Sequence, residues 1–501
     1  MNDHRFIVKS TSSLIVLTIF VKLCGIIKQS VIAYYFGTNS EMDMYFIASD
    51  FVAEIGIVFF SALMINLVNL YLEEKEAHQK GSNIFTDTTV VFVLLSVAVS
   101  LVISIFPGHL ARVLAPGAAV ESISRLILYL RLFCFALACV AVSNICTAVL
   151  NAERDFLPGK CVGFIQSVCV IVCCILLYKK TGILSLIIGT LLFFIIEDIF
   201  LLIKVKKYVW FKRPHIFNNN KIKELIKLWI PLFLSNSVVQ LNAIIDKAIA
   251  TSIGEGNVSA LSYGHFVFTS IHSIIIMNIC TVLFAYFSAY LLDNKMEELI
   301  TTFRSSLSLV VFIMIPIMVL CVCESEYIVK ILYGRGAFSE QSVALTNNAL
   351  VGYAVGIVFL AIRDIIMQVF YALKKNQIAM INGVIGVIIN IILSMVLSKR
   401  IGVFGIAVAD GIAYLLVAIF SCVEIKYEIK NIWNIQVMKS VIPSVIFTFI
   451  SVIPLLFVKK LVHANAMLHL LFESGCFILC FILSLIITKN DSIKRFIEFI
   501  K

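Results

Sequence analysis

The chain has 501 residues, of which 61% are hydrophobic and only 14% are charged, and its mean hydropathy is +1.02. A soluble protein of this length would expose too much apolar surface to remain dispersed, so the composition excludes the soluble globular class. The formal net charge of +10 needs no nucleic-acid partner, because the basic residues follow the topology expected of a membrane protein.

The N-terminal stretch MNDHRFIVKSTSSL runs directly into a long apolar segment and contains no small-residue cleavage site. We therefore expect a retained first helix rather than a removed signal peptide. Apolar runs long enough to cross roughly 30 Å of hydrocarbon then recur along the chain. Each should form a helix, because backbone groups cannot stay unpaired in lipid. We predict an all-α polytopic membrane protein with about 14 transmembrane helices, at 11–36, 43–72, 85–106, 121–150, 160–178, 182–204, 226–253, 258–292, 303–332, 343–373, 377–398, 402–425, 437–458 and 466–488.

The lysines and arginines of the loops orient these helices, because cytoplasmic loops carry an excess of both. When the N-terminus is placed in the cytoplasm, the basic residues near 5–9, 204–227 and 426–439 all fall inside. Few of the chain's 40 lysines and arginines fall outside. Both termini are therefore predicted to be cytoplasmic.

Four short stretches recur in the same order at an offset of about 220 residues, which indicates an internal repeat. FGTNSEMDMY (36–45) is followed by IGEGNVSALSY (253–263), LAPGAA (114–119) by LYGRGAF (332–338), VLNAERD (149–155) by FYALKKN (370–376), and TGILSLIIG (181–189) by IGVFGIAVA (401–409). The repeat unit holds six helices, so both copies share one orientation. We expect a pseudo-twofold axis along the membrane normal and a transport site between the copies.

The repeat divides the chain into four parts. We predict an N-terminal six-helix lobe at 1–206, a basic cytoplasmic linker at 207–225 and a C-terminal six-helix lobe at 226–430. Residues 431–501 supply two additional transmembrane helices and a cytoplasmic tail. The basic linker is typical of a loop at an anionic lipid surface.

The first predicted helix carries two lysines within its apolar run. A charge at the bilayer centre costs about 2.5–3.5 kcal/mol on insertion scales, so it should face a cavity or a partner. At roughly 100° per residue, Lys22, Lys28 and Gln29 share an arc of about 120° with Gly25. No acidic residue lies three or four positions from either lysine, which favours contact with a ligand. Lys28 is the stronger candidate, because Lys22 could snorkel to the surface.

Other ionisable residues also fall within predicted spans. They are Asp43, Asp50, Glu54, Arg131, Glu197, Asp198, Asp246, Lys247, Arg363, Asp364 and Asp410. Asp50 and Glu54 lie four residues apart on one helical face. Asp246–Lys247 and Arg363–Asp364 are adjacent opposite charges that should not share a face. For these two pairs we favour structural bridges between helices over ligand contact. The four residues of the pairs, together with Asp50 and Glu54, also remain possible cavity or coupling charges.

Signals for other kinds of site are weak. His265 and His272 lie seven residues apart, and a satisfied polar contact is favoured over a metal or proton-coupling site. The 14 cysteines lack the paired spacing of a zinc or redox site. No GxxxxGK[ST] phosphate loop and no nucleophile–base pattern occurs, so we expect neither ATP hydrolysis nor another enzyme activity.

Three stretches resemble a known family: KLCGIIKQSVIAYYFGTNSEMDMYFIA (22–48), ILYGRGAFSEQSVALTNNALVGYAVG (331–356) and FYALKKNQIAMINGVIGVIINIIL (370–393). Together with the repeat and the two extra helices, they resemble the MurJ (MviN) lipid II flippases. This family belongs to the MOP exporter superfamily, beside Wzx-type oligosaccharide flippases and MATE drug exporters. The YGRGAF turn followed by FYALK is the most specific match.

The resemblance implies a cationic central cavity that holds the diphosphate of an undecaprenyl-linked precursor, and a groove for the lipid tail along the two extra helices. It implies substrate contacts at Lys22 and Lys28, where the family has arginine, and at Asp43, which matches a family aspartate. With Gln29 and Gly25 from the same arc, these form the predicted substrate-binding set. A lysine can serve phosphate as a point charge, without the bidentate fork of arginine.

Two departures bear on the substrate. The family's further cavity arginines would fall near Gly56 and Phe266, neither of which is basic, and the motif after the second span reads FFSALMINLVNL. Lipid II and another polyprenyl-diphosphate-linked glycan, moved by a Wzx-like flippase, therefore both remain open. A MATE-like cation-coupled exporter would favour an acidic cavity. In a membrane scaffold without transport, the cavity charges would pair with one another.

We expect a bacterial inner-membrane flippase that moves a lipid II-like precursor by alternating access. Its expected partners are the polyprenyl-diphosphate-linked glycan and membrane lipids, and no nucleic acid. We expect a monomer without a metal or cofactor, driven by an ion gradient or by the membrane potential.

Overall fold

A computed structural model describes residues 2–76, 82–214, 220–434, 442–443, 445–455 and 466–487. These residues form helices and connecting loops, and no strand occurs among them. The chain divides into two compact units. The N-terminal unit comprises Met1–Ser259 and Gly336–Phe338, and the C-terminal unit comprises Ala260–Arg335 and Ser339–Lys501.

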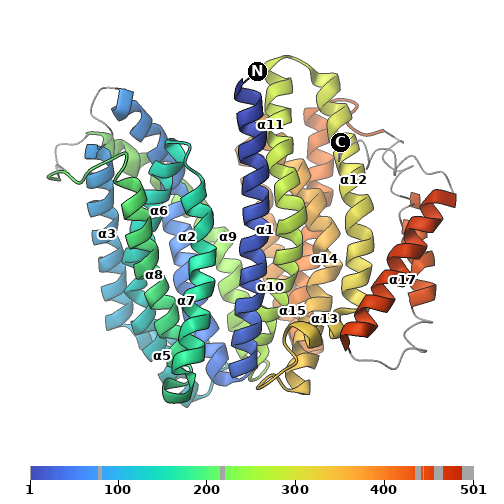
Figure 1. The fold of residues 1–501 in the computed structure, drawn as a ribbon, viewed down its shortest axis with the longest axis horizontal. Helices are drawn as coiled ribbons and strands as arrows, with labels where there is room; N and C mark the ends of the chain where they lie inside the picture. Colours follow the sequence, from blue (N-terminus) through green and yellow to red (C-terminus); the bar gives the residue numbers. More distant parts are fainter. Residues whose placement is uncertain are drawn as a thin grey trace. The chain divides into compact units, whose positions relative to one another are not determined.

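The N-terminal unit is built from long helices joined by short turns (Figure 1). Its elements are α1 (Asn2–Phe36), α2 (Ser40–Glu74), α3 (Ser82–Ile105), α4 (Pro107–Leu114), α5 (Val120–Cys134), α6 (Ala136–Ala152), α7 (Leu157–Thr181), α8 (Leu184–Val205) and α9 (Asn220–Thr251). The side chain of Asn39 begins α2 by accepting the backbone N–H of Met42 at 2.8 Å. α1 packs along α7, and α2 packs against α6 and α9.

An aromatic cluster fixes the position of α9 in this unit. The ring of Trp229 stacks on Phe233 at 4.8 Å and meets Phe92 of α3 edge-on at 5.4 Å. Its indole N–H donates to the backbone oxygen of Phe59 in α2 at 2.7 Å. In lipid, helices associate through such close packing and hydrogen bonds. α9 therefore packs with the N-terminal unit, although the sequence repeat assigns its residues to the C-terminal lobe. The boundaries of the two lobes remain a prediction from the sequence repeat.

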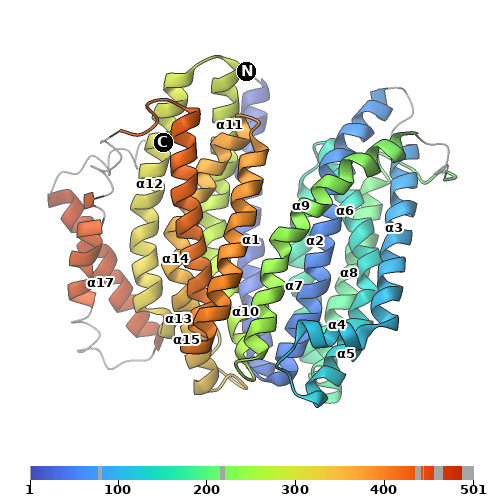
Figure 2. The same ribbon diagram turned by 180° about the vertical axis from the view of Figure 1, so that it is seen from behind.

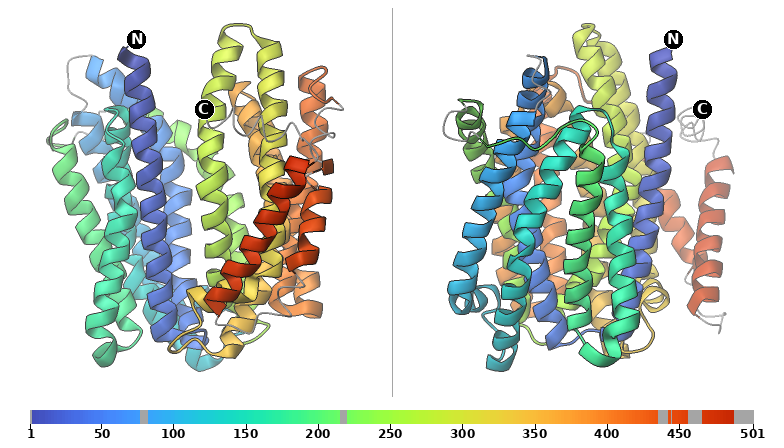
Figure 3. Two further views of the ribbon diagram at one scale, coloured as in Figure 1. Left: turned by 45° about the vertical axis from the view of Figure 1, so that its right-hand side comes forward. Right: turned by 60° about the vertical axis from the view of Figure 1, so that its left-hand side comes forward.

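The C-terminal unit begins within α10 (Asn257–His272). It continues with the π-helix η3 (Ser273–Met277), α11 (Asn278–Leu292), α12 (Met296–Cys323), α13 (Ser325–Leu332), α14 (Glu340–Ala372), α15 (Asn376–Glu428) and α17 (Ala466–Ile487). α14 packs along α15 (Figure 2), and α17 packs on α13 (Figure 3). Small residues bring α14 and α15 together: a Cβ on Gly352 would lie 2.6 Å from that of Ala407.

The predicted membrane fold is confirmed, with differences at particular spans. By length and composition, nine helical segments of the described residues can cross a membrane, and one of them, Asn376–Glu428, covers two predicted spans. Non-helical backbone at Ile401 and Gly402 separates those two spans inside α15. The predicted span at 121–150 breaks into α5 and α6, and that at 303–332 breaks into α12 and α13. Of the predicted span at 437–458, the stretch Val445–Leu455 is an apolar helix, and 435–441, 444 and 456–465 lie outside the described residues.

The backbone repeats itself at the predicted offset. Arg154 and Lys374, 220 positions apart, both have φ of 60°. In each case the next residue, Asp155 or Lys375, donates its backbone N–H to the carbonyl five residues earlier, at 2.9 and 2.8 Å. This hydrogen bond, closed by a left-handed residue, is the Schellman ending of a helix. Two copies of one helix end therefore occupy equivalent places in the repeat.

Two further pairs of features confirm the repeat. Gly182 (φ 55°, ψ −131°) and Gly402 (φ 62°, ψ −140°) have nearly the same backbone conformation, which a residue with a Cβ rarely adopts. α4 and α13 are both eight-residue helices, and they begin 218 positions apart, each directly before its copy of the glycine turn. Neither short helix is predicted from the sequence, because both lie within or beside longer apolar runs.

Candidate functional site

Lys28 lies between α1 and α7 without a carboxylate partner. Its Nζ donates to Oε1 of Gln166 in α7 at 3.1 Å. The two helices approach closely at Gly163 of α7, which has no Cβ. A Cβ at this position would lie 2.6 Å from the Val21 side chain. No ion pair joins Lys28 to a carboxylate in the part of the chain that the structure describes. Lys28 is thus a half-buried cation held by a neutral amide.

The rest of the predicted arc lies along the same helix. Lys22 is half-buried, and the like charge of Lys160 in α7 acts on it. Gln29 and Gly25 are half-buried as well. Oε1 of Gln29 is inaccessible to solvent and has no hydrogen-bond partner among the described residues. The arc therefore presents two cations and an unused amide oxygen.

Asp43 has a different environment from the lysines. Its side chain is 2% exposed. One carboxylate oxygen accepts the backbone N–H of Gly256 at 2.6 Å, and the other accepts that of Ser259 at 2.7 Å. Gly256 directly precedes α10 and Ser259 lies in its first turn, where a carboxylate satisfies otherwise unpaired N–H groups. Asp43 is therefore committed to capping a helix, and its predicted substrate contact finds no support in this geometry.

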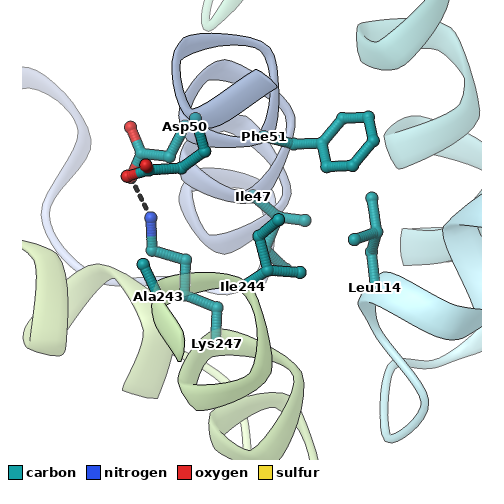
Figure 4. Close-up of a pocket in the computed structure, with 8 residues that line it drawn as sticks. Ile47, Asp50, Phe51, Leu114, Ala243, Ile244 and Lys247 are labelled. Carbon is teal, nitrogen blue, oxygen red and sulfur yellow. Dashed lines mark hydrogen bonds and ion pairs between the residues drawn. The ribbon is translucent and has the colours of Figure 1, made fainter. Parts of the chain in front are cut away.

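Asp50 and Lys247 form an ion pair between α2 and α9 (Figure 4). The pair lines a pocket of about 230 Å³, including its open side, together with Glu54 and Leu114. Oε2 of Glu54 is inaccessible to solvent and makes no hydrogen bond within the described residues. Asp246, beside Lys247 in the sequence, is buried and accepts a hydrogen bond from Asn242 at 3.3 Å.

Arg363 and Asp364 of α14 form a compact charge cluster in the C-terminal unit. Although adjacent residues should not share a helical face, Nη2 and Nε of Arg363 lie 2.6 and 3.0 Å from one Asp364 oxygen. The long arginine side chain folds back along the helix and crosses the angular gap. His272 Nε2 of α10 lies 3.1 Å from the other carboxylate oxygen, and the guanidinium lies 5.5 Å from the ring centre of Tyr414 in α15.

The remaining ionisable residues of the predicted spans are dispersed. Arg131 is exposed, Glu197 is buried in α8 beside Asp198, and Asp410 accepts a hydrogen bond from Asn390 at 2.7 Å. His265 contacts the ring of Tyr353, at 5.2 Å between centroids. No group of three or more His, Cys, Asp or Glu suited to a metal ion occurs among the described residues.

Gly56 and Phe266 are the two positions where the family resemblance places cavity arginines. A Cβ on Gly56 would lie 2.8 Å from Val140 of α6, so this position serves helix packing in the N-terminal unit. Phe266 is half-buried in α10. Neither position supplies a cation.

Two polar residues near the lysine arc escaped the sequence analysis. Gln166 and Lys160 both belong to α7, whose predicted span begins at 160. The motif KCVGFIQ (160–166) repeats the K-x-x-G-x-x spacing of KLCGIIK (22–28), and this similarity could have revealed them.

Comparison with known proteins identifies similar chains. Residues 32–476 match the family model described as "Lipid II flippase MurJ". A protein of Thermotoga maritima described as "Probable lipid II flippase MurJ" is 24% identical over 443 residues, covering 88% of this chain and 90% of that protein. A protein of Rickettsia prowazekii with the same description is 26% identical over 407 residues, covering 79% of each chain.

Solved structures show the same fold. The structure described as "Lipid II flippase MurJ, inward closed conformation" superposes with a TM-score of 0.84 at 22% identity, covering 96% of this chain and 99% of that one. An inward-facing MATE family transporter of the MOP superfamily has a TM-score of 0.63 at 15% identity, covering 84% of this chain and 95% of that one.

Proposed function

Because its match over residues 32–476 makes the chain a member of the MurJ family of lipid II flippases, we propose that it translocates lipid II across the bacterial cytoplasmic membrane. The description of the relatives as probable lipid II flippases supports lipid II over the other substrates that the sequence leaves open. The chain spans most of the length of these relatives, so the proposal concerns the whole protein.

The observation that carries the proposal is the uncompensated cation of Lys28. A charge within a membrane span is costly, and it is retained where it serves a pathway or a ligand. Among the described residues the Lys28 ammonium donates one hydrogen bond, to the neutral Gln166 amide, which leaves two of its three N–H donors for a ligand. A phosphate oxygen accepts such donors through short, charge-assisted hydrogen bonds. Lys28 would thus hold the diphosphate of the lipid-linked precursor.

Alternating access supplies the mechanism that we propose. The backbone features that repeat at an offset of about 220 residues suit a change in the exposure of one site to either side of the membrane. Both termini would lie in the cytoplasm, and the protein would act as a monomer. Transport needs no enzyme activity or cofactor, and an ion gradient or the membrane potential would drive it.

Reconstitution of the full chain in proteoliposomes tests the function. Fluorescent lipid II is placed in both leaflets, and its exposure to a membrane-impermeant quencher is followed over time. The proposal expects faster translocation than in protein-free vesicles, whereas equal rates would refute it. A parallel arm with a lipid-linked polysaccharide precursor identifies the competing Wzx-like activity, which would show as selective transport of that precursor.

A further inference from the structure

α1 and α7 present matching polar residues at a constant register. Positions 22, 25 and 28 of α1 hold Lys, Gly and Lys, and positions 160, 163 and 166 of α7 hold Lys, Gly and Gln. Each position of the second set follows the first by 138 residues. The spacing of three places each set on one arc of its helix.

Contacts in the structure show how the two helices run. Lys28 donates to Gln166 at 3.1 Å, and a Cβ on Gly163 would lie 2.6 Å from the Val21 side chain. Nearer the ends of both helices, the rings of Tyr35 and Tyr178 lie 4.7 Å apart. Contacts that advance together along both helices mean that α1 and α7 run parallel. The two polar arcs therefore face each other, with Lys28 and Gln166 in contact and with Lys22 and Lys160 near the contact of Val21 with Gly163.

The facing arcs contain more positive charge than the protein neutralises. Lys22 and Lys160 are like charges that act on each other, and neither forms an ion pair with a described carboxylate. Asp50 is the carboxylate whose charge acts on Lys28, and it is already paired with Lys247. Like charges within a membrane protein repel at short range, so their retention favours an anionic occupant.

Gln166 adds directional donors to this cationic surface. Its Oε1 accepts the Lys28 hydrogen bond, which orients its amide N–H₂ group away from the ammonium. That group donates no hydrogen bond to another described residue. It can therefore donate to a second oxygen of a phosphate group that the ammonium also contacts.

We propose that α7 contributes a second half to the phosphate site, with Lys160 and Lys22 forming an outer subsite and Lys28 and Gln166 an inner one. Lys160 is exposed in the first turn of α7, at the predicted cytoplasmic end, so the outer subsite lies nearer that end than the inner one. This inference rests on the proposed function and deepens it by naming Lys160 and Gln166 as binding residues.

Equilibrium binding to the purified full chain tests the two subsites. Undecaprenyl diphosphate is the probe, and undecaprenyl monophosphate is compared with it. We expect Lys160→Ala and Gln166→Ala each to weaken binding of the diphosphate about 10-fold, the scale of one charge-assisted hydrogen bond. The loss should be smaller for the monophosphate in Lys160→Ala, because one phosphate can occupy only one subsite at a time.

Matched variants separate binding from folding. Lys180→Ala removes an exposed lysine from the other end of α7 and should bind like the unmodified chain. Lys160→Arg should bind the diphosphate like the unmodified chain, since it keeps the positive charge. Thermal unfolding reports whether Gln166→Ala remains folded, and Gln166→Asn supplies a second, shorter amide at that position.

The outcomes distinguish this inference from the function on which it rests. If Lys28→Ala loses binding while Lys160→Ala and Gln166→Ala keep it, the α7 subsites are refuted and the proposed function stands. If the unmodified chain does not bind undecaprenyl diphosphate at all, both fail. Equal losses in Lys160→Ala and Lys180→Ala would also refute the outer subsite, because they indicate a diffuse charge effect.

Discussion

Lys28 in the N-terminal unit and Arg363 in the C-terminal unit are both cations within membrane-spanning helices, yet their surroundings are opposite. Arg363 contacts the carboxylate of Asp364 and the face of Tyr414, and Asp364 in turn meets His272. Among the described residues, Lys28 donates a hydrogen bond only to the neutral amide of Gln166. A compensated charge stabilises the helices that carry it, whereas an uncompensated charge is suited to a charged ligand.

Removing the uncompensated cation should have the largest effect on function. Lys28→Ala should abolish complementation of a strain that lacks its own lipid II flippase, because each lost charge-assisted contact costs about 1.5–3 kcal/mol, or roughly 10- to 100-fold in binding. The amount of folded protein in the membrane should not change. Lys28→Arg should retain function, and full complementation by Lys28→Ala would contradict the assignment.

Removing the partner of the compensated cation should instead affect stability. Asp364→Ala leaves Arg363 and His272 without their shared carboxylate, and breaking a buried charge cluster in this way costs about 3–5 kcal/mol. Chemical unfolding in detergent measures the loss. The double variant Arg363→Gln/Asp364→Asn keeps the packing and removes both charges, so it should recover most of the stability. A single variant as stable as the unmodified chain would disprove the structural role.

The contact between α1 and α7 offers a smaller perturbation near Lys28. Gly163→Ala places a Cβ within 2.6 Å of Val21, and overpacking of this kind costs about 1–3 kcal/mol. We expect a lower unfolding midpoint. Gly475→Ala in α17 meets no atom within 4 Å and serves as the control, with an unchanged or higher midpoint. Identical behaviour of the two variants would show that α1 and α7 do not approach as described.

The Asp50–Lys247 pair is expected to give the smallest effect, because both side chains are partly exposed. Partly exposed ion pairs contribute about 1 kcal/mol or less, and Glu54 lines the same pocket as an alternative partner for Lys247. Asp50→Asn should therefore lower the free energy of unfolding only slightly, with a larger loss in Asp50→Asn/Glu54→Gln. If Asp50→Asn alone destabilises the protein as much as Asp364→Ala, the distinction between the two charge clusters is lost.

The sequence predicts the helices and their repeat well, because both depend on local patterns. Runs of apolar residues specify the membrane helices, and the glycines at 182 and 402 specify one unusual backbone conformation twice. The break at Phe135 and the helices α4 and α13 could not be predicted. They interrupt or adjoin apolar runs without a change in composition that would mark the interruption.

The site could be predicted only on the helix that carries its charges. The spacing of Lys22 and Lys28 defines their shared arc, but Gln166 gains meaning only from the register of α1 against α7, which depends on packing at Gly163. Asp43 was predicted to contact substrate because the family resemblance marks that position. Its commitment to the α10 backbone depends on a contact between residues more than 200 positions apart.

Binding of lipid II to two charge variants tests the central contrast most directly. Lys28→Gln removes the uncompensated cation, and Arg363→Gln/Asp364→Asn removes the compensated pair without changing net charge. With purified, folded protein, Lys28→Gln should weaken lipid II binding at least about 10-fold, and the double variant should bind like the unmodified chain. Unchanged binding in Lys28→Gln, or an equal loss in the double variant, would contradict the conclusion that the uncompensated cation holds the substrate.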